Sequence, residues 1–122
     1  MESGSISDGQ ISASSVYSPH KFGHDAYQGR LHYQETLQRA GGWSAGQVDS
    51  NQWLQVDLRS QHWVTRIATQ GRNGYSQWVT KFNLRYMSRE YGLIFQYYRE
   101  QGQTVQRVMP RLAKKKNESH SV

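Results

Sequence analysis

Apolar and polar side chains alternate along the segment QWLQVDL, residues 52–58. Leu54, Val56 and Leu58 are separated by polar residues. Successive side chains of a strand point to opposite faces, so this pattern predicts a half-buried β-strand whose three aliphatic residues face a core. The pattern alone leaves two alternatives for Asp57 beside Trp53. They could form a catalytic carboxylate next to an aromatic platform, or they could lie on the outer face of a scaffold strand.

Further segments carry the same signal, with β-branched and aromatic residues between Gly, Asn and Ser turns. One of these turns is centred on Asn73-Gly74. Short strands separated by such turns predict an all-β sandwich or barrel. The expected strands, besides the first, are residues 63–70, 79–87 and 94–100, with a weaker one at 104–109. Near the start of the chain, residues 10–15 are the stretch that could pair as a strand.

Residues 16–29 and 43–51 lack periodicity and are rich in turn formers, so we expect them to be loops. Residues 110–122 contain a proline, a basic run and no apolar face. We expect this segment to be a disordered tail, because it offers too little burial to offset the cost of ordering it.

The composition and charge of the chain argue against several classes of function. The net charge of +6 is concentrated at the end of the chain: residues from Arg99 onward carry +4, and residues 1–98 carry +2. A basic tail is a weak argument for nucleic-acid binding, which we do not expect. Mean hydropathy is −0.89 and no apolar run approaches the ~20 residues that span a bilayer. The chain has no cysteine, which excludes disulfides and cysteine-ligated zinc within it.

No residue pattern indicates catalysis. The histidines fit no serine-hydrolase or zinc-protease motif, and the acidic residues show no paired arrangement. His20 and His24 are four residues apart beside Asp25, which would suggest a metal site on a helix. Pro19 and Gly23 argue against a helix, so we expect a solvated loop, no metal and no cofactor.

Several motifs together resemble a known family. In order they are MESGSISDGQISASS, GRLH, GGWSAG, QWLQVDL, VTRIATQGR and WVTKFNLRY. This series is similar to the discoidin domain, also called the coagulation factor V/VIII type C domain. The core motifs resemble most the contactin-associated (Caspr/neurexin IV) type. The resemblance implies a discoidin-type jelly-roll β-sandwich of the galactose-binding-like class. It also implies that residues 52–58 are scaffold and that Asp57 is a structural hydrogen-bond acceptor.

The chain departs from the family pattern at its end. The family's paired cysteines and its closing strands have no counterpart in this sequence. We therefore expect a C-terminally truncated, partial discoidin domain over residues 1–109, followed by the basic tail at 110–122. The resemblance implies an extracellular or cell-surface location, where the Asn117-Glu118-Ser119 sequon could carry a glycan.

The resemblance places ligand binding in the loops at one end of the sandwich. The expected loop residues are His20, Lys21, Phe22, Trp43, Arg72, Asn73 and Tyr75. For Trp43 the favoured alternative is a place in the core. For Phe22 and Tyr75 two alternatives remain open: an exposed ring, or a ring folded back over the end of the sandwich. The implied partners are a cell-surface protein, an anionic phospholipid or a glycan. We expect a non-enzymatic extracellular module that mediates cell adhesion, with peripheral membrane or carbohydrate binding as alternatives.

Overall fold

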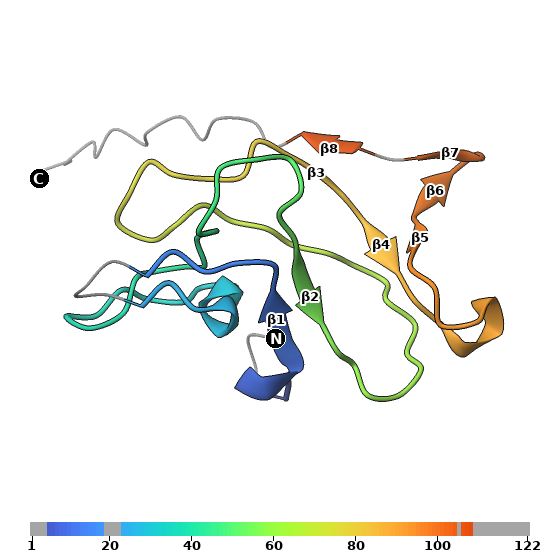
Figure 1. Ribbon diagram of the computed structural model, residues 1–122, viewed down its shortest axis with the longest axis horizontal. Coiled ribbons are helices and arrows are strands. Elements are labelled where there is room, and N and C mark those ends of the chain that lie inside the picture. The colour runs from blue at the N-terminus through green and yellow to red at the C-terminus, as the bar shows by residue number, and fades with distance from the viewer. Residues whose placement is uncertain (1–4, 19–22, 105, 109–122) are drawn as a thin grey trace, which may run out of the picture. The chain divides into compact units, whose positions relative to one another are not determined.

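The computed structural model describes residues 5–18, 23–104 and 106–108 (Figure 1). The chain divides into two compact units, residues 1–78 and 79–122. Regular structure within the described residues is limited to strands of two or three residues and short 3-10 helices, with no α-helix. None of these helices is long and apolar enough to cross a membrane. The expected tail at 110–122 and its sequon lie outside the described residues.

In the first unit, β1 (Ile11–Ala13) pairs antiparallel with β2 (Leu54–Val56), as Figure 1 shows. Both strands were expected from the sequence, and both are shorter than the alternating segments that predicted them. The ladder is extended by the side chain of Gln10, whose amide nitrogen donates to the carbonyl oxygen of Asp57 over 2.6 Å. The backbone N–H of Asp57 donates back to the carbonyl oxygen of Gln10 over 2.7 Å.

Asp57 also has the structural role expected of it. Its side-chain oxygen accepts a hydrogen bond from the backbone N–H of Arg59 over 2.7 Å. Arg59 adopts a left-handed conformation with φ of 60°. A carboxylate that accepts from the backbone two residues ahead stabilises such a turn. Asp57 therefore ends the strand and shapes the turn after it.

The apolar core of the first unit is small. Ile11 and Ala40 are buried, whereas Leu54, Val56 and Leu58 are only half-buried. The expectation that all three aliphatic residues of 52–58 belong to the core is therefore only partly correct. The helix η2 (Ala26–Gly29) packs against β1, and its last residue approaches β2 closely: a Cβ at Gly29 would lie 2.8 Å from the Leu54 side chain.

Polar side chains fill much of the remaining interior. Gln28 of η2 has no exposed surface. Its amide nitrogen donates to the carbonyl oxygen of Ala40 over 2.8 Å, and its amide oxygen accepts from the backbone N–H of Asp25. Buried backbone groups outside sheets need such partners, since leaving them unpaired is costly. Gln28 thus ties η2 to the loop that ends at Ala40.

Residues 63–70 were expected to form a strand, and this expectation is wrong. The segment is irregular and every residue in it is exposed, including Trp63 at 99%. Its β-branched residues favour an extended backbone, but a strand also needs a hydrogen-bonded neighbour. No strand within the described part of the chain pairs with it.

The described residues of the second unit form three antiparallel strand pairs. Its strands are β3 (Lys81–Asn83), β4 (Arg85–Tyr86), β5 (Gln96–Tyr97), β6 (Arg99–Glu100), β7 (Gln103–Thr104) and β8 (Gln106–Val108). β3 pairs with β8, β4 with β5, and β6 with β7. The strands expected over 79–87, 94–100 and 104–109 are confirmed in place, although the first two are each interrupted by one residue. The turn between β6 and β7 has positive φ at Gln101 and Gly102, as a tight two-residue hairpin requires.

A substitution tests whether Gln28 stabilises the first unit through its amide. Gln28→Met keeps the length of the side chain but leaves the carbonyl of Ala40 and the N–H of Asp25 without their partner. We expect a loss of about 2–3 kcal/mol in the free energy of unfolding. Urea unfolding measures it, with the exposed Gln38→Met as the matched control. Equal stability of the two variants would contradict the assignment.

Candidate functional site

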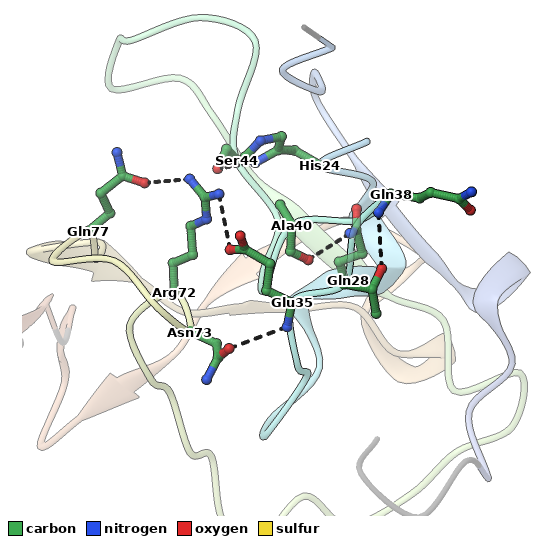
Figure 2. A network of polar contacts seen from close by, with 10 residues as sticks. His24, Gln28, Glu35, Gln38, Ala40, Ser44, Arg72, Asn73 and Gln77 are labelled. Carbon is green, nitrogen blue, oxygen red and sulfur yellow. Dashed lines mark hydrogen bonds and ion pairs between the residues drawn. The ribbon is translucent and has the colours of Figure 1, made fainter. Parts of the chain in front are cut away.

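Two loops of the first unit meet around Arg72. They bring together Glu35, Arg72, Asn73, Tyr75 and Gln77, which we call the loop cluster (Figure 2). Tyr75 lies in the same turn and is not labelled in that view. The cluster joins residues almost forty positions apart in sequence, so tertiary structure alone creates it.

Arg72 is the centre of the loop cluster. Its guanidinium lies 3.4 Å from a carboxylate oxygen of Glu35 and donates to the amide oxygen of Gln77 over 2.9 Å (Figure 2). The same group stacks 3.8 Å from the ring centroid of Tyr75, at the distance of a cation–π contact. The Arg72 side chain is only 16% exposed. It is therefore held on three sides, and its charge is largely matched by Glu35.

Asn73 holds the two loops together. Its side-chain oxygen accepts from the backbone N–H of Glu35 over 3.3 Å, and its backbone N–H donates to the carbonyl oxygen of Gly41 over 3.2 Å. Gly74 follows with φ of 79°, and the N–H of Tyr75 donates to the carbonyl of Arg72 over 3.4 Å. The turn expected at Asn73-Gly74 is thus confirmed, and it presents the Tyr75 ring with 52% of its surface exposed.

His24, which lies in the same unit, is buried, with 4% of its surface exposed. The expectation of a solvated loop at this position is wrong. A ring nitrogen of His24 lies 2.9 Å from the hydroxyl of Ser44, and the ring meets that of Tyr17 edge-on at 5.3 Å. Burial, and then the positive charge of Arg72, hold the pKa of His24 below its ordinary value of 6.5, while Glu35 and Asp25 oppose that shift.

The expected site residues fall into three groups. Arg72, Asn73 and Tyr75 come together in the loop cluster. Trp43 is half-buried and its indole N–H donates to the carbonyl oxygen of Ser15 over 3.0 Å, so it connects loops beneath the surface. The third group, His20, Lys21 and Phe22, lies outside the described residues.

Sequence reasoning missed Glu35, Gln77 and the His24–Ser44 pair. Gln77 is five residues from Arg72, close enough for a turn to join them. Glu35 and Ser44 had no local signal, because each meets its partner only after the loops fold together.

The loop cluster is suited to binding. The terminal nitrogens of Arg72 pair with Gln77 and Glu35, although its buried Nε has no hydrogen-bond partner, and the guanidinium stacks on the Tyr75 ring. Within the described ranges, no group of three or more His, Cys, Asp or Glu side chains is arranged to hold a metal ion. A rigid aromatic ring with polar groups around it offers contact area with little loss of entropy on binding.

Two comparisons show which known proteins this chain is similar to. The family model for the F5/8 type C domain matches residues 10–118. Among individual proteins, the chain is similar to lactadherin from Bos taurus, with 34% identity over 94 residues. That match covers 70% of this chain and 20% of lactadherin, so the chain spans about a fifth of the length of that relative.

Gly41 tests the contact between the two loops. A Cβ at this position would lie 2.6 Å from the Asn73 Cβ and 2.9 Å from its carbonyl oxygen, so Gly41→Ala must push the 72–77 turn away. We expect a loss of about 1–3 kcal/mol in stability, as for other overpacked sites. Gly9→Ala is the matched control, because nothing lies within 4 Å of its Cβ position. Equal unfolding midpoints for the two variants would show that the loops do not meet closely at Gly41.

Burial of neutral His24 predicts a pH dependence of stability. Its pKa is lower in the folded than in the unfolded chain, so the unfolded chain binds more protons below pH 6.5. The contribution is fully present above the unfolded pKa and is lost as the pH falls below it. Thermal melts from about pH 7.5 to 5.5 should therefore show a falling midpoint.

The matched variants separate His24 from the other histidines. His24→Gln should flatten the profile in this range, whereas the exposed His62→Gln should keep the wild-type slope. A slope unchanged by His24→Gln would show that another group causes the pH dependence.

Proposed function

This chain belongs to the F5/8 type C domain family, and on that premise we propose that it binds a cell-surface ligand through the loop cluster. The domain of this family is a discoidin-type β-sandwich, so the all-β fold class expected from the sequence is confirmed. F5/8 type C domains are in general binding modules without enzymatic activity. Because a fold can host many ligands, the choice among them has to come from the site.

The observation that carries the proposal is the fixed position of the Tyr75 ring. It is half-exposed on a turn that Arg72, Asn73 and Gly41 hold against the neighbouring loop. Tyrosine contributes large contact area at binding surfaces and loses few rotamers when it is immobilised. The loop cluster therefore presents a preformed anchor for a partner.

Among the ligand classes a protein is favoured, and we propose that binding to it mediates cell adhesion. Arg72 is paired with Glu35, and residues 1–78 contain six Lys or Arg and six Asp or Glu. A surface with matched charges suits a polar protein interface better than a strongly anionic one. The motifs that resemble the contactin-associated adhesion proteins support the same role, and they support a location outside the cell or on its surface.

Anionic phospholipid is the second candidate. An exposed ring beside a guanidinium can enter the headgroup region while the cation meets a lipid phosphate. Tyr75 and Arg72 have this chemistry, and Lys21 and Phe22 would add to it. The pairing of Arg72 with Glu35 weakens this candidate, since the carboxylate repels the same headgroups. A glycan stacked on the free face of Tyr75 is the third class.

A cell-attachment assay tests the proposal and distinguishes the three ligand classes. Cells are allowed to attach to surfaces coated with the whole chain, and attachment is counted. Tyr75→Ala should reduce attachment by about tenfold, as expected when a central aromatic anchor is lost. Trp63→Ala is the matched control, because this fully exposed aromatic side chain of the same unit lies outside the loop cluster.

The ligand class follows from pretreatment of the cells. Removing surface proteins with a protease should abolish attachment if the ligand is a protein. Competition by phosphatidylserine vesicles would indicate the lipid, and loss after glycosidase treatment would indicate a glycan. Attachment unchanged by Tyr75→Ala in a folded variant would contradict binding through the loop cluster.

A further inference from the structure

One segment of the first unit has the side chains of a β-strand but no partner strand. In residues 63–70, which read WVTRIATQ, five of the eight residues are β-branched or aromatic. Such residues favour an extended backbone in a half-buried sheet. All eight are exposed instead, and the large apolar side chains Trp63, Val64 and Ile67 are 99%, 63% and 51% exposed. Three exposed apolar side chains so close together mark a contact surface.

The backbone of this segment is free as well. Figure 1 shows the chain between β2 and β3 as a plain trace without an arrow. Within the described ranges, no hydrogen bond joins residues 63–68 to the rest of the chain. The segment is attached just beyond them, where the side-chain oxygen of Gln70 accepts from the backbone N–H of His32 over 2.9 Å. Unpaired N–H and C=O groups on a strand-forming segment are a template for a strand from another chain.

A second copy of the same segment is the partner that these residues fit best. Two identical antiparallel strands related by a two-fold axis place one residue directly opposite its own copy. Arg66 is the only charged residue of the segment, so an axis at Arg66 would set two like charges against each other. An axis at Thr65 avoids this and keeps every paired residue within 63–67, where the backbone is free. Trp63 then lies opposite Ile67 of the second copy, and Val64 opposite Arg66.

The pairs in this register suit each other. Threonine opposite threonine, and an aromatic ring opposite a β-branched side chain, are among the cross-strand pairs that stabilise sheets. Trp63, Thr65 and Ile67 also share one face of their strand, because alternate residues point the same way. The two-fold axis joins this face to the same face of the second copy, so that two rings and two aliphatic groups shield one another from water. The two Arg66 side chains lie on the other face, diagonally apart.

The net charge predicts how this contact depends on salt. Residues 1–78 contain six Lys or Arg and six Asp or Glu, so the units that pair carry no net charge. Residues 79–122 contain nine Lys or Arg and three Asp or Glu, so each whole chain carries +6 and two chains repel each other. Salt screens this repulsion beyond about a Debye length. Pairing through residues 63–67 therefore strengthens as salt is added, whereas a contact held by ion pairs weakens.

We propose that two copies of the chain pair through residues 63–67 as antiparallel strands and form a closed two-fold dimer. Such an isologous contact uses the same patch on both copies and is complete with two. Arg72 follows the segment closely in the sequence, so the dimer carries one loop cluster after each paired strand. Two loop clusters hold a surface that displays many ligands more tightly than one does, because the second contact forms at high local concentration. That consequence rests on the proposed function, but the pairing itself does not.

Analytical ultracentrifugation of the whole chain without ligand tests the pairing. The average mass should rise from one chain towards two as protein concentration increases, and it should rise at lower concentration when salt is added. Thr65, which is exposed, lies at the axis, so Thr65→Asp sets two carboxylates against each other and should weaken the dimer at least about tenfold. Val48→Asp is the matched control, because it makes the same charge change at a fully exposed position of the same unit. Both changes lower the net positive charge, so Val48→Asp should dimerise at least as well as the unaltered chain.

Disulfide cross-linking tests the register and does not depend on the charged variants. The chain has no cysteine, so a single replacement gives one site in each copy. Directly opposite residues of an antiparallel pair have Cα atoms about 4.5–5.5 Å apart, within reach of a disulfide. Thr65→Cys should therefore form a covalent dimer under mild oxidation. Val64→Cys and Arg66→Cys should form far less of it, because neither lies opposite its own copy.

Several results would overturn the proposal. A single-chain mass at every concentration would leave the segment to a strand of a different protein. Equal loss of the dimer in Thr65→Asp and Val48→Asp, or cross-linking through Arg66→Cys in preference to Thr65→Cys, would show that the copies do not pair in this register. A mass that keeps rising past two chains would show open-ended association in place of a closed dimer.

Tyr75→Ala keeps this proposal distinguishable from ligand binding by the loop cluster. The change leaves residues 63–67 intact, so the variant should dimerise as the unaltered chain does, whether or not the loop cluster binds a ligand. Loss of the dimer in a folded Tyr75→Ala variant would assign the contact between copies to the loop cluster and overturn pairing through residues 63–67.

Discussion

The first unit depends on one buried amide, that of Gln28. Long stretches of this unit have no ladder of strand hydrogen bonds, so side chains must pair with backbone groups that would otherwise be buried and unsatisfied. Gln28 does this for Asp25 and Ala40 at once, from a position with no exposed surface. Gln10 does the same for Asp57 at the end of β1. The loops are held in place by polar contacts because the apolar core is too small to do so alone.

The loop cluster depends on the contacts made by Gln28. Ala40, which Gln28 holds, is followed by Gly41, whose missing side chain lets Asn73 approach. Asn73 positions Glu35, and Glu35 with Gln77 holds the guanidinium of Arg72. His24 stays neutral beneath, because burial and the charge of Arg72 both disfavour its protonated form. These contacts fix the loop cluster by hydrogen bonds and an ion pair within the chain, and a preformed surface of this kind would reduce the entropy lost in the binding proposed above.

The two units differ in formal charge. The first unit has matched charges and one anchored aromatic ring, which suits the polar macromolecular ligand proposed above. The second unit carries the whole net charge of the sequence.

The sequence by itself determined the all-β class, the place of most strands and the turn at Asn73-Gly74, because alternation and turn chemistry are local properties. It also indicated the structural role of Asp57. The tertiary structure decided those features that depend on a partner residue far away in the sequence. Residues 63–70 have strand-forming side chains but lack a paired neighbour, and Leu54, Val56 and Leu58 alternate correctly yet remain half-buried. The burial of His24 and the pairing of Glu35 with Arg72 arise only when loops far apart in sequence meet, and no local pattern encodes that.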